Sequence, residues 1–208
     1  MSGNTSATGG YIIEVPPSPP GVHEIAAGLQ QMIVALTGLP GSLVRPRWQR
    51  MPPTQPDPET TWASIGVTRV EADAYPYITH DGAAQLVGTE GKGVDRMQRH
   101  LTVSVLATFY GPEAELCAGS VRDGLYMNQN WEPLASLGLK LRDFRDLARN
   151  AELINQQWVD RFDVLLELRQ QIDRVYPVLN IEGADVVLHS PSLNDQTVTV
   201  REDTEVWP

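Results

Sequence analysis

The sequence predicts an α+β domain: an antiparallel sheet of four or more strands, with two helices packed on one face. Three patterns support this prediction. Apolar residues recur at helical spacing over residues 23–37. They alternate with polar residues over residues 99–110, at the period of a strand. The pair Gly111-Pro112 follows directly and predicts a second helix, because proline is favoured in the first turn of a helix.

The chain between the first helix and the central strand is expected to be largely extended. The helix should end at Gly38, where a Gly-Leu-Pro-Gly run begins. Residues 45–59 contain five prolines, which lack the amide donor of a helix or central strand, so a long extended loop is predicted. Residues 61–70 and 75–79 are rich in β-branched and aromatic side chains, which is typical of strands. A Gly-rich connection over residues 82–93 follows.

The second helix is expected to carry an apolar stripe of small and aliphatic side chains: Ala114, Cys117, Ala118, Val121 and Leu125. Gly119 should let another element approach closely. Cys117 lies on the stripe, where a lone cysteine normally serves as a small buried hydrophobic residue. A reactive thiolate is disfavoured, because Glu113 and Glu115 in the first turn would raise the pKa of the thiol.

Beyond residue 130 the pattern is weaker. Residues 131–136 fit a short helical turn, and residues 142–150 show no clear period. Residues 158–175 fit both a strand and a helix; the strand is favoured, because apolar and charged side chains alternate. Residues 178–189 predict a partner strand, after a turn at Tyr176-Pro177.

Three regions are expected along the chain. Residues 1–20, rich in Gly, Ser, Thr and Pro, cannot bury enough apolar surface to order themselves. They predict a flexible N-terminal arm, or an extended arm that orders against a neighbouring subunit. Residues 21–190 form the folded domain, and residues 191–208 form a polar C-terminal tail.

The composition excludes several classes of function. The net charge of −10, from 16 basic and 26 acidic residues, is unsuited to a general nucleic-acid binder, which needs cations to neutralise phosphates. The sequence contains neither an apolar run that could span a membrane nor a secretory signal, so the chain is expected to stay in the cytoplasm of the cell that makes it. A single cysteine excludes an internal disulfide.

The sequence contains no catalytic or metal-binding pattern, so neither an enzyme nor a cofactor is predicted. The four histidines are scattered and share no metal-ligand spacing. The alternative from the enzyme class is a hydrolase or nucleotide-binding domain built from His80, Asp81 and the Gly-rich run 88–93. That run lacks the spacing of a phosphate-binding loop, and the His-Asp pair fits a solvated turn better.

Three segments instead have the composition of recognition surfaces. The candidate interface residues are Arg45, Arg47, Trp48, Gln49 and Arg50 in the first segment, Arg122, Asp123, Gln129 and Asn130 in the second, and Trp158, Arg161 and Asp163 in the third. Arginine and tryptophan are enriched in interface hot spots. In the second segment, Arg122 and Asp123 can form a local ion pair, and Gly124 lets another element approach. Each segment also has a purely structural interpretation: an Arg-Trp stack that fixes the loop, a helix end with satisfied caps, and a solvated strand face.

In order and spacing, four motifs together resemble the phage neck or tail terminator family. They are Arg-Pro-Arg-Trp-Gln with its following prolines (45–53), Phe-Tyr-Gly-Pro (109–112), Arg-Asp-Gly-Leu with Gln-Asn (122–125 and 129–130), and Trp-Val-Asp-Arg-Phe-Asp (158–163). The resemblance spans residues 33–182. One position departs from it, because His100 stands where an acidic residue is expected to open the central strand.

The resemblance implies a structural virion protein, assembled in the host cytoplasm, that forms a homo-oligomeric ring, by analogy a hexamer. The ring would cap the tail tube, stop its growth and bind the head–tail connector protein, while DNA passes through its lumen without sequence-specific binding. An acidic lumen suits this passage, because like charges repel. The alternative in the same assembly is a head-completion or collar protein that docks on the portal and its adaptor.

Overall fold

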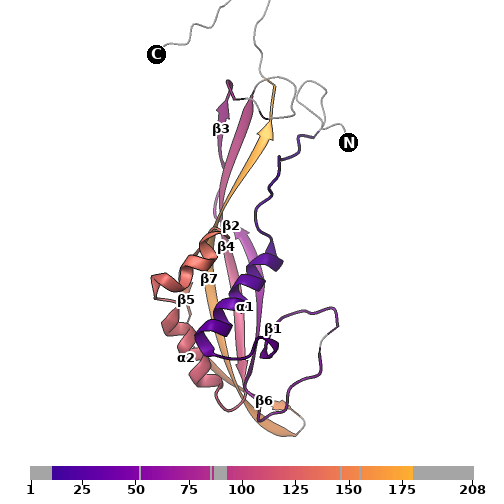
Figure 1. Ribbon diagram of the computed structural model, residues 1–208, viewed down its shortest axis with the longest axis vertical. Helices are drawn as coiled ribbons and strands as arrows, with labels where there is room; N and C mark the ends of the chain where they lie inside the picture. The colour runs from indigo at the N-terminus through magenta and orange to yellow at the C-terminus, as the bar shows by residue number, and fades with distance from the viewer. Residues whose placement is uncertain are drawn as a thin grey trace, which may run out of the picture. The chain divides into compact units, whose positions relative to one another are not determined.

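The computed structural model shows an α+β chain that divides into two compact units (Figure 1). The larger unit comprises Pro16–Ile78 and Met97–Arg174. The smaller unit comprises Thr79–Arg96 and the described residues at the two ends of the chain. The residues that the structure describes are 11–51, 53–84, 86, 93–145, 147–154 and 156–179.

The described residues form three α-helices: α1 (Val22–Thr37), α2 (Ala114–Gly124) and the single turn α3 (Glu132–Ala135). Short 3-10 turns lie at Gly41–Leu43 and Asn128–Trp131. The predicted helix over residues 23–37, the helix after Pro112 and the helical turn within residues 131–136 are therefore confirmed. None of these described helices is long and apolar enough to cross a membrane.

Local signals set both ends of α1. At its start, the Glu24 carboxylate accepts a hydrogen bond from the Gly21 N–H at 3.1 Å, next to the positive end of the helix dipole. At its end, Gly38 has φ 73° and donates its N–H to the carbonyl of Val34 at 3.0 Å. Glycine adopts this left-handed conformation readily, so the helix ends at Gly38 as predicted.

Seven strands of the described residues form one sheet. They are β1 (Val44–Pro46), β2 (Trp62–Ala72), β3 (Tyr77–Asp81), β4 (Val94–Tyr110), β5 (Leu139–Phe144), β6 (Ala148–Ile154) and β7 (Gln157–Pro177). The strand order is β1-β2-β4-β7-β5, with β3 paired to β4 and β6 paired to β7. Strands β2, β3, β4 and β7 correspond to the predicted ones, so the preference for a strand over a helix at residues 158–175 is correct.

The sheet is mixed, which corrects the expectation of a purely antiparallel sheet. β1 pairs with β2 in parallel, with Val44 opposite Ala63. Its last two residues also lie inside the segment expected to be an irregular loop. Proline is tolerated at Pro46 because β1 is an edge strand, which needs hydrogen bonds on one side only. Directly after it, Arg47 donates its N–H to the carbonyl of Ile65 at 2.8 Å and extends the pairing.

Strands β5 and β6 lie in and around the segment that shows no clear period in the sequence. A register shift between Leu141 and Asp143 explains this for β5, since the extra residue Arg142 interrupts the alternation. β6 pairs antiparallel with β7, with Ala148 opposite Asp163. These strands are therefore identified by their pairing rather than by their own pattern.

The end of β7 differs from the prediction. The expected turn at Tyr176-Pro177 is wrong, because both residues belong to β7, which runs without interruption from Gln157. More and less buried side chains alternate from Phe162 to Asp173, and Pro177 is tolerated as the last residue of the strand. Of the predicted partner strand over residues 178–189, Val178 and Leu179 are not in a strand, and residues 180–189 lie outside the described residues.

The core of the larger unit lies between the helices and one face of the sheet. α1 packs on β1 and β2 and contacts α2 and α3, while α3 contacts β5 (Figure 1). Alternate residues of the central strands join α1 and α2 in this core, among them Ile65, Val105, Phe109 and Leu166. Their neighbours along each strand point away from α1, and we call the surface they form the open face.

Glycine controls the contact between α1 and α2 at one position. A Cβ at Gly124 would lie 2.8 Å from Cδ2 of Leu36, so glycine lets the two helices approach as predicted. The same expectation for Gly119 is wrong, because a Cβ there would meet nothing within 4 Å. Gly119 is therefore not needed for packing within the described part of the chain.

Candidate interaction surface

A row of stacked side chains crosses the open face from β1 to β7. The Arg45 guanidinium carbon lies 5.7 Å from the centroid of the Trp62 ring. The Trp62 and Tyr110 rings stack with their centroids 4.3 Å apart and their planes 9° from parallel. On the other side, the Arg161 guanidinium carbon lies 5.9 Å from the Tyr110 centroid. We call these four residues the aromatic row, in which cation–π contacts flank an aromatic stack.

Strand register brings these residues together. Trp62 at the start of β2 stands opposite Tyr110 at the end of β4, because the two strands are antiparallel. Arg45 reaches the same edge because β1 runs parallel to β2. On the far side, the Gly111 N–H donates to a carbonyl of β7 at 3.1 Å and holds the end of β4 beside Arg161. The first and third candidate segments therefore meet on the open face.

The row ends in an ion-pair network at Arg161. Its guanidinium donates to both carboxylate oxygens of Asp163, at 3.1 and 2.9 Å, and to Glu152 on β6 at 3.2 Å. Although burial works against the charged form, hydrogen bonds from Arg161 and Thr108 hold the pKa of Asp163 below its usual value. Burial raises the pKa of Tyr110, and the Arg161 charge partly opposes this shift. Arg161 and Asp163 thus share one strand face, as predicted, and are joined there.

The lowered pKa of Asp163 makes a pH-dependent contribution to stability. Its carboxyl pKa is lower in the folded state than the ordinary value of 3.8, so the charged form stabilises the fold above that pH. This contribution is lost as the pH falls through the folded-state pKa. We expect Asp163→Asn to lower the free energy of unfolding by about 1–3 kcal/mol at neutral pH. The difference in the free energy of unfolding between the variant and wild type should shrink below about pH 4.

Urea unfolding of both proteins, from neutral pH down to about pH 3, measures this difference. Asp160→Asn is the matched control. Its carboxylate is exposed and pairs with Arg149 at 2.8 Å, so its loss should cost less than about 1 kcal/mol. If the difference in the free energy of unfolding between Asp163→Asn and wild type stays constant over this pH range, it contradicts the stabilising role of the Asp163 charge in the ion-pair network.

The first segment is tied to its own domain by both arginines. Arg45 donates to the carbonyls of Ser42 and Thr54, at 3.2 and 2.8 Å. Arg47 donates to the Thr108 hydroxyl on the open face. The predicted Arg-Trp stack therefore exists, but it joins Arg45 to Trp62 of β2. Of the other candidates in this segment, Gln49 donates to the carbonyl of Pro46 at 3.2 Å, and Arg50 is exposed.

Trp48 itself is 70% exposed, although its ring lies over the backbone of β2. A Cβ at Gly66 would lie 2.8 Å from both the Trp48 ring and Cβ of Arg47, so only glycine lets the two side chains approach. Trp48 has φ 55°, a conformation uncommon for residues with a side chain. A hollow of about 380 Å³ adjoins the ring, and its lining residues are Arg45, Pro46, Arg47, Trp48, Gln49, Pro53, Gln55, Trp62 and Ser64.

The second segment lies on the helix side of the sheet, at the end of α2. Arg122 and Asp123 form the predicted ion pair at 2.7 Å, on the surface. Asn130 donates its side-chain amide to the carbonyl of Gly124 at 2.7 Å and so caps the helix end. Gln129 is exposed, and Gln129 and Asn130 line a groove of about 380 Å³ with residues of α1 and α3.

Trp158 does not belong to the aromatic row. It is 74% exposed and shares a strand face with buried Phe162, whereas Arg161 points to the open face. Its partner across the β6–β7 hairpin is Leu153, which is also exposed. The third segment therefore presents candidate residues on both faces of the sheet.

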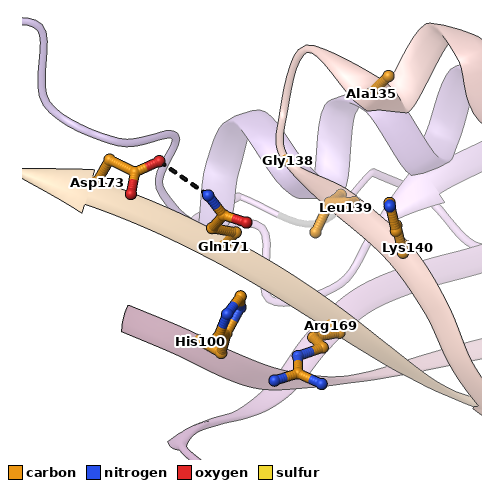
Figure 2. A pocket seen from close by; sticks show the side chains of 8 residues that line it. All are labelled: His100, Ala135, Gly138, Leu139, Lys140, Arg169, Gln171 and Asp173. Carbon is orange, nitrogen blue, oxygen red and sulfur yellow. Dashed lines mark hydrogen bonds between the residues drawn. The ribbon is translucent and has the colours of Figure 1, made fainter. Parts of the chain in front are cut away.

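A larger hollow, of about 600 Å³, lies beside β5 and β7 (Figure 2). Figure 2 shows His100 of β4, Arg169 of β7 and Lys140 of β5 around it. Gln171 donates to Asp173 at 3.1 Å along its edge. Lys140 and Arg169 stand opposite each other in the β5–β7 register, which the sequence pattern of this segment does not reveal.

The residues considered for catalysis do not form an enclosed site. Nδ1 of His80 lies 2.6 Å from a carboxylate oxygen of Asp95, and the pair is exposed. Asp81 accepts hydrogen bonds from the N–H groups of Ala83 and Ala84, at 3.2 and 3.1 Å, which is the geometry of a turn. Of the Gly-rich run 88–93, residues 88–92 lie outside the described residues.

Cys117 is buried in the core, as its place on the apolar stripe predicts. Burial and the nearby Glu113 charge raise the pKa of its thiol, which disfavours a reactive thiolate. Within the part of the chain that the structure describes, no three His, Cys, Asp or Glu side chains are grouped so that they could hold a metal ion.

Comparison with known sequences identifies the family of the chain. No curated protein matches the chain. A sequence profile of a family described as phage neck terminator protein matches residues 23–191, which is well over half of the chain and includes all three candidate segments. This chain therefore belongs to the phage neck terminator family, a family of structural proteins of the virion neck.

Proposed function

We propose that this neck protein forms a closed hexameric ring that caps the tail tube and joins it to the head–tail connector. A ring whose subunits meet head to tail needs two different surfaces on each subunit. The larger unit offers the aromatic row with Trp48 on the open face, and the groove beside Gln129 and Asn130 on the helix side. That these unlike surfaces occupy opposite faces of one sheet is the observation that carries the proposal.

The charge distribution supports passage of DNA through such a ring. The sequence of the smaller unit, residues 1–15, 79–96 and 175–208, contains three basic and ten acidic residues, which gives −7 of the total of −10. Acidic side chains repel the phosphate backbone. Their excess in the sequence therefore suits a protein that surrounds a lumen through which DNA passes without sequence-specific binding.

The exposed hairpin suits contacts along the axis of the virion. Leu153 and Trp158 form a cross-strand pair of large apolar side chains on the surface of the larger unit. Exposed aromatic anchors of this kind are typical of binding surfaces. We infer that this pair contacts the tail tube protein or the connector protein, and that the ring assembles in the host cytoplasm before head and tail join.

Phage particles made without this protein test the proposal. We expect filled heads, separate tails and irregular tail lengths, because the growth of the tail tube is not ended. Electron microscopy of lysates, counting joined particles and measuring tail lengths, gives the readout. A head-completion or collar protein would instead leave heads that lose DNA and tails of uniform length. Joined particles with uniform tails in the absence of the protein would contradict both assignments.

A further inference from the structure

Trp48 is an exposed aromatic side chain that is already held in position on the open face. Its side chain is 70% exposed, although the ring lies over Gly66 of β2. The backbone at Trp48 has φ 55°, and Cβ of Arg47 approaches the same glycine beside the ring. The ring is therefore positioned before a partner binds, so little side-chain entropy is lost on binding.

The groove between α1 and α3, on the other side of the sheet, has the composition of a pocket for an indole ring. Its volume is about 380 Å³, and none of the nine residues that line it is charged. Of these, Met32 and Leu134 are buried, whereas Gln31, Ala35 and Gln129 are exposed. The apolar lining suits an aromatic ring, and the exposed amides supply acceptors for the indole N–H, which a buried tryptophan needs.

The surroundings of Trp48 and of the groove carry opposite charges. Arg50 is exposed two residues after Trp48, and Glu132 is exposed directly before Pro133, which lines the groove. The ion pairs among the described residues involve neither Arg50 nor Glu132. Opposite charges at the rims of two surfaces favour their association and fix its orientation.

A second copy of this chain is the partner that these two surfaces fit. In a head-to-tail ring, one surface of each copy meets a different surface of the next. Trp48 and the groove lie on opposite sides of the sheet, so they cannot meet within one copy. Trp158, the other largely exposed tryptophan of the described chain, shares a strand face with Phe162 and so projects from the side of the sheet that carries the groove. It therefore suits this head-to-tail contact less well than Trp48.

We propose that Trp48 of one copy inserts into the groove between α1 and α3 of the next copy, with Arg50 facing Glu132 across the contact. The inference rests on the proposed ring and names the two surfaces that join its subunits. Tryptophan anchors that fill pockets dominate the binding energy of many interfaces. Each copy offers one anchor and one groove, so the contact repeats until the ring closes.

Crosslinking inside phage particles tests the proposal. The double variant Gln49→Cys with Gln129→Cys places one thiol next to Trp48 and another on the groove. A short bismaleimide should join neighbouring copies into a ladder of covalent multimers on a denaturing gel. The native Cys117 is buried and should not react. Each single-cysteine variant should remain monomeric, because identical positions do not meet in a head-to-tail ring.

Gln49→Cys with Leu116→Cys is the matched control. Leu116 of α2 is exposed but does not line the groove, so this pair should give no ladder. If the cysteine variants do not assemble into particles, a charge exchange replaces them. Arg50→Glu and Glu132→Arg should each lower the infective titre by about tenfold or more, and their combination should restore it, because the opposite charges face each other again.

Several results would overturn the proposal. They are particles that contain the protein but give no ladder, an equal ladder with the Leu116→Cys control, dimers from a single-cysteine variant, and a charge exchange that restores nothing. A crosslink from the Gln49→Cys variant to a different virion protein would assign Trp48 to that protein instead. Joined particles with uniform tails but no ladder would reject this contact alone, because the particles made without the protein still test the ring.

Discussion

Phage that carry Arg47→Ala together with Trp48→Ala are expected to produce filled heads and tails that fail to join, although the protein remains folded. Trp48 is 70% exposed and lies outside the core, so its removal costs the monomer little. In an interface, arginine and tryptophan anchors contribute about 2 kcal/mol or more each. This loss of binding free energy is repeated at every contact between subunits of the ring. We therefore expect the infective titre to fall by about a hundredfold or more.

Arg69→Ala with Tyr75→Ala is the control for this variant. It also removes one arginine and one aromatic ring from the larger unit, and Tyr75 is fully exposed. Counts of joined particles and tail lengths should be those of wild type. The purified double variants should have melting temperatures within a few degrees of each other. A much lower melting temperature for Arg47→Ala with Trp48→Ala would mean that these two side chains mainly support their own domain, and would contradict their place in an interface.

The elements that the sequence predicts are those whose pattern is local. Helix α1 shows its buried face through residues three and four apart, and β4 shows its buried face through alternate residues. Strand β5 is not visible in this way, because the register shift at Arg142 interrupts its alternation. The parallel pairing of β1 is also not visible, since it depends on a distant partner strand, which no local spacing specifies.

The candidate surface was predictable in its residue types but not in its assembly. Arg45, Arg47 and Arg161 can be selected from composition, because arginine near tryptophan is typical of interfaces. Trp62 and Tyr110 carry no such signal by themselves. The available signal was their position: Trp62 lies at the start of one predicted strand and Tyr110 at the end of another. An antiparallel register places these two positions opposite each other. Without that register, the two candidate segments stay unconnected.

The motif Phe-Tyr-Gly-Pro has a physical explanation at the junction of β4 and α2. Phe109 is fully buried in the core, and Tyr110 belongs to the aromatic row on the opposite face. The next residue, Gly111, turns the chain from the strand toward the helix with φ 95° and donates its N–H to β7. One glycine therefore positions both the core residue and the surface residue that precede it.

Gly111→Ala is accordingly expected to lower the free energy of unfolding by about 2–4 kcal/mol. A Cβ there would lie 2.6 Å from the carbonyl oxygen of Thr60 and 2.9 Å from Cα of Thr61. These are backbone atoms, so no rotation of a side chain can relieve the contact. The positive φ adds to the cost, because residues with a Cβ rarely adopt it.

Gly119→Ala introduces the same methyl group eight residues further along and should have the opposite effect. A Cβ at Gly119 meets nothing within 4 Å, and the position lies inside α2, where alanine is favoured over glycine by about 0.8–1 kcal/mol. Urea unfolding followed by circular dichroism should therefore separate the two variants by about 3–5 kcal/mol. Equal stabilities would show that the turn at Gly111 can relax, and the positions of Phe109 and Tyr110 would then not depend on it.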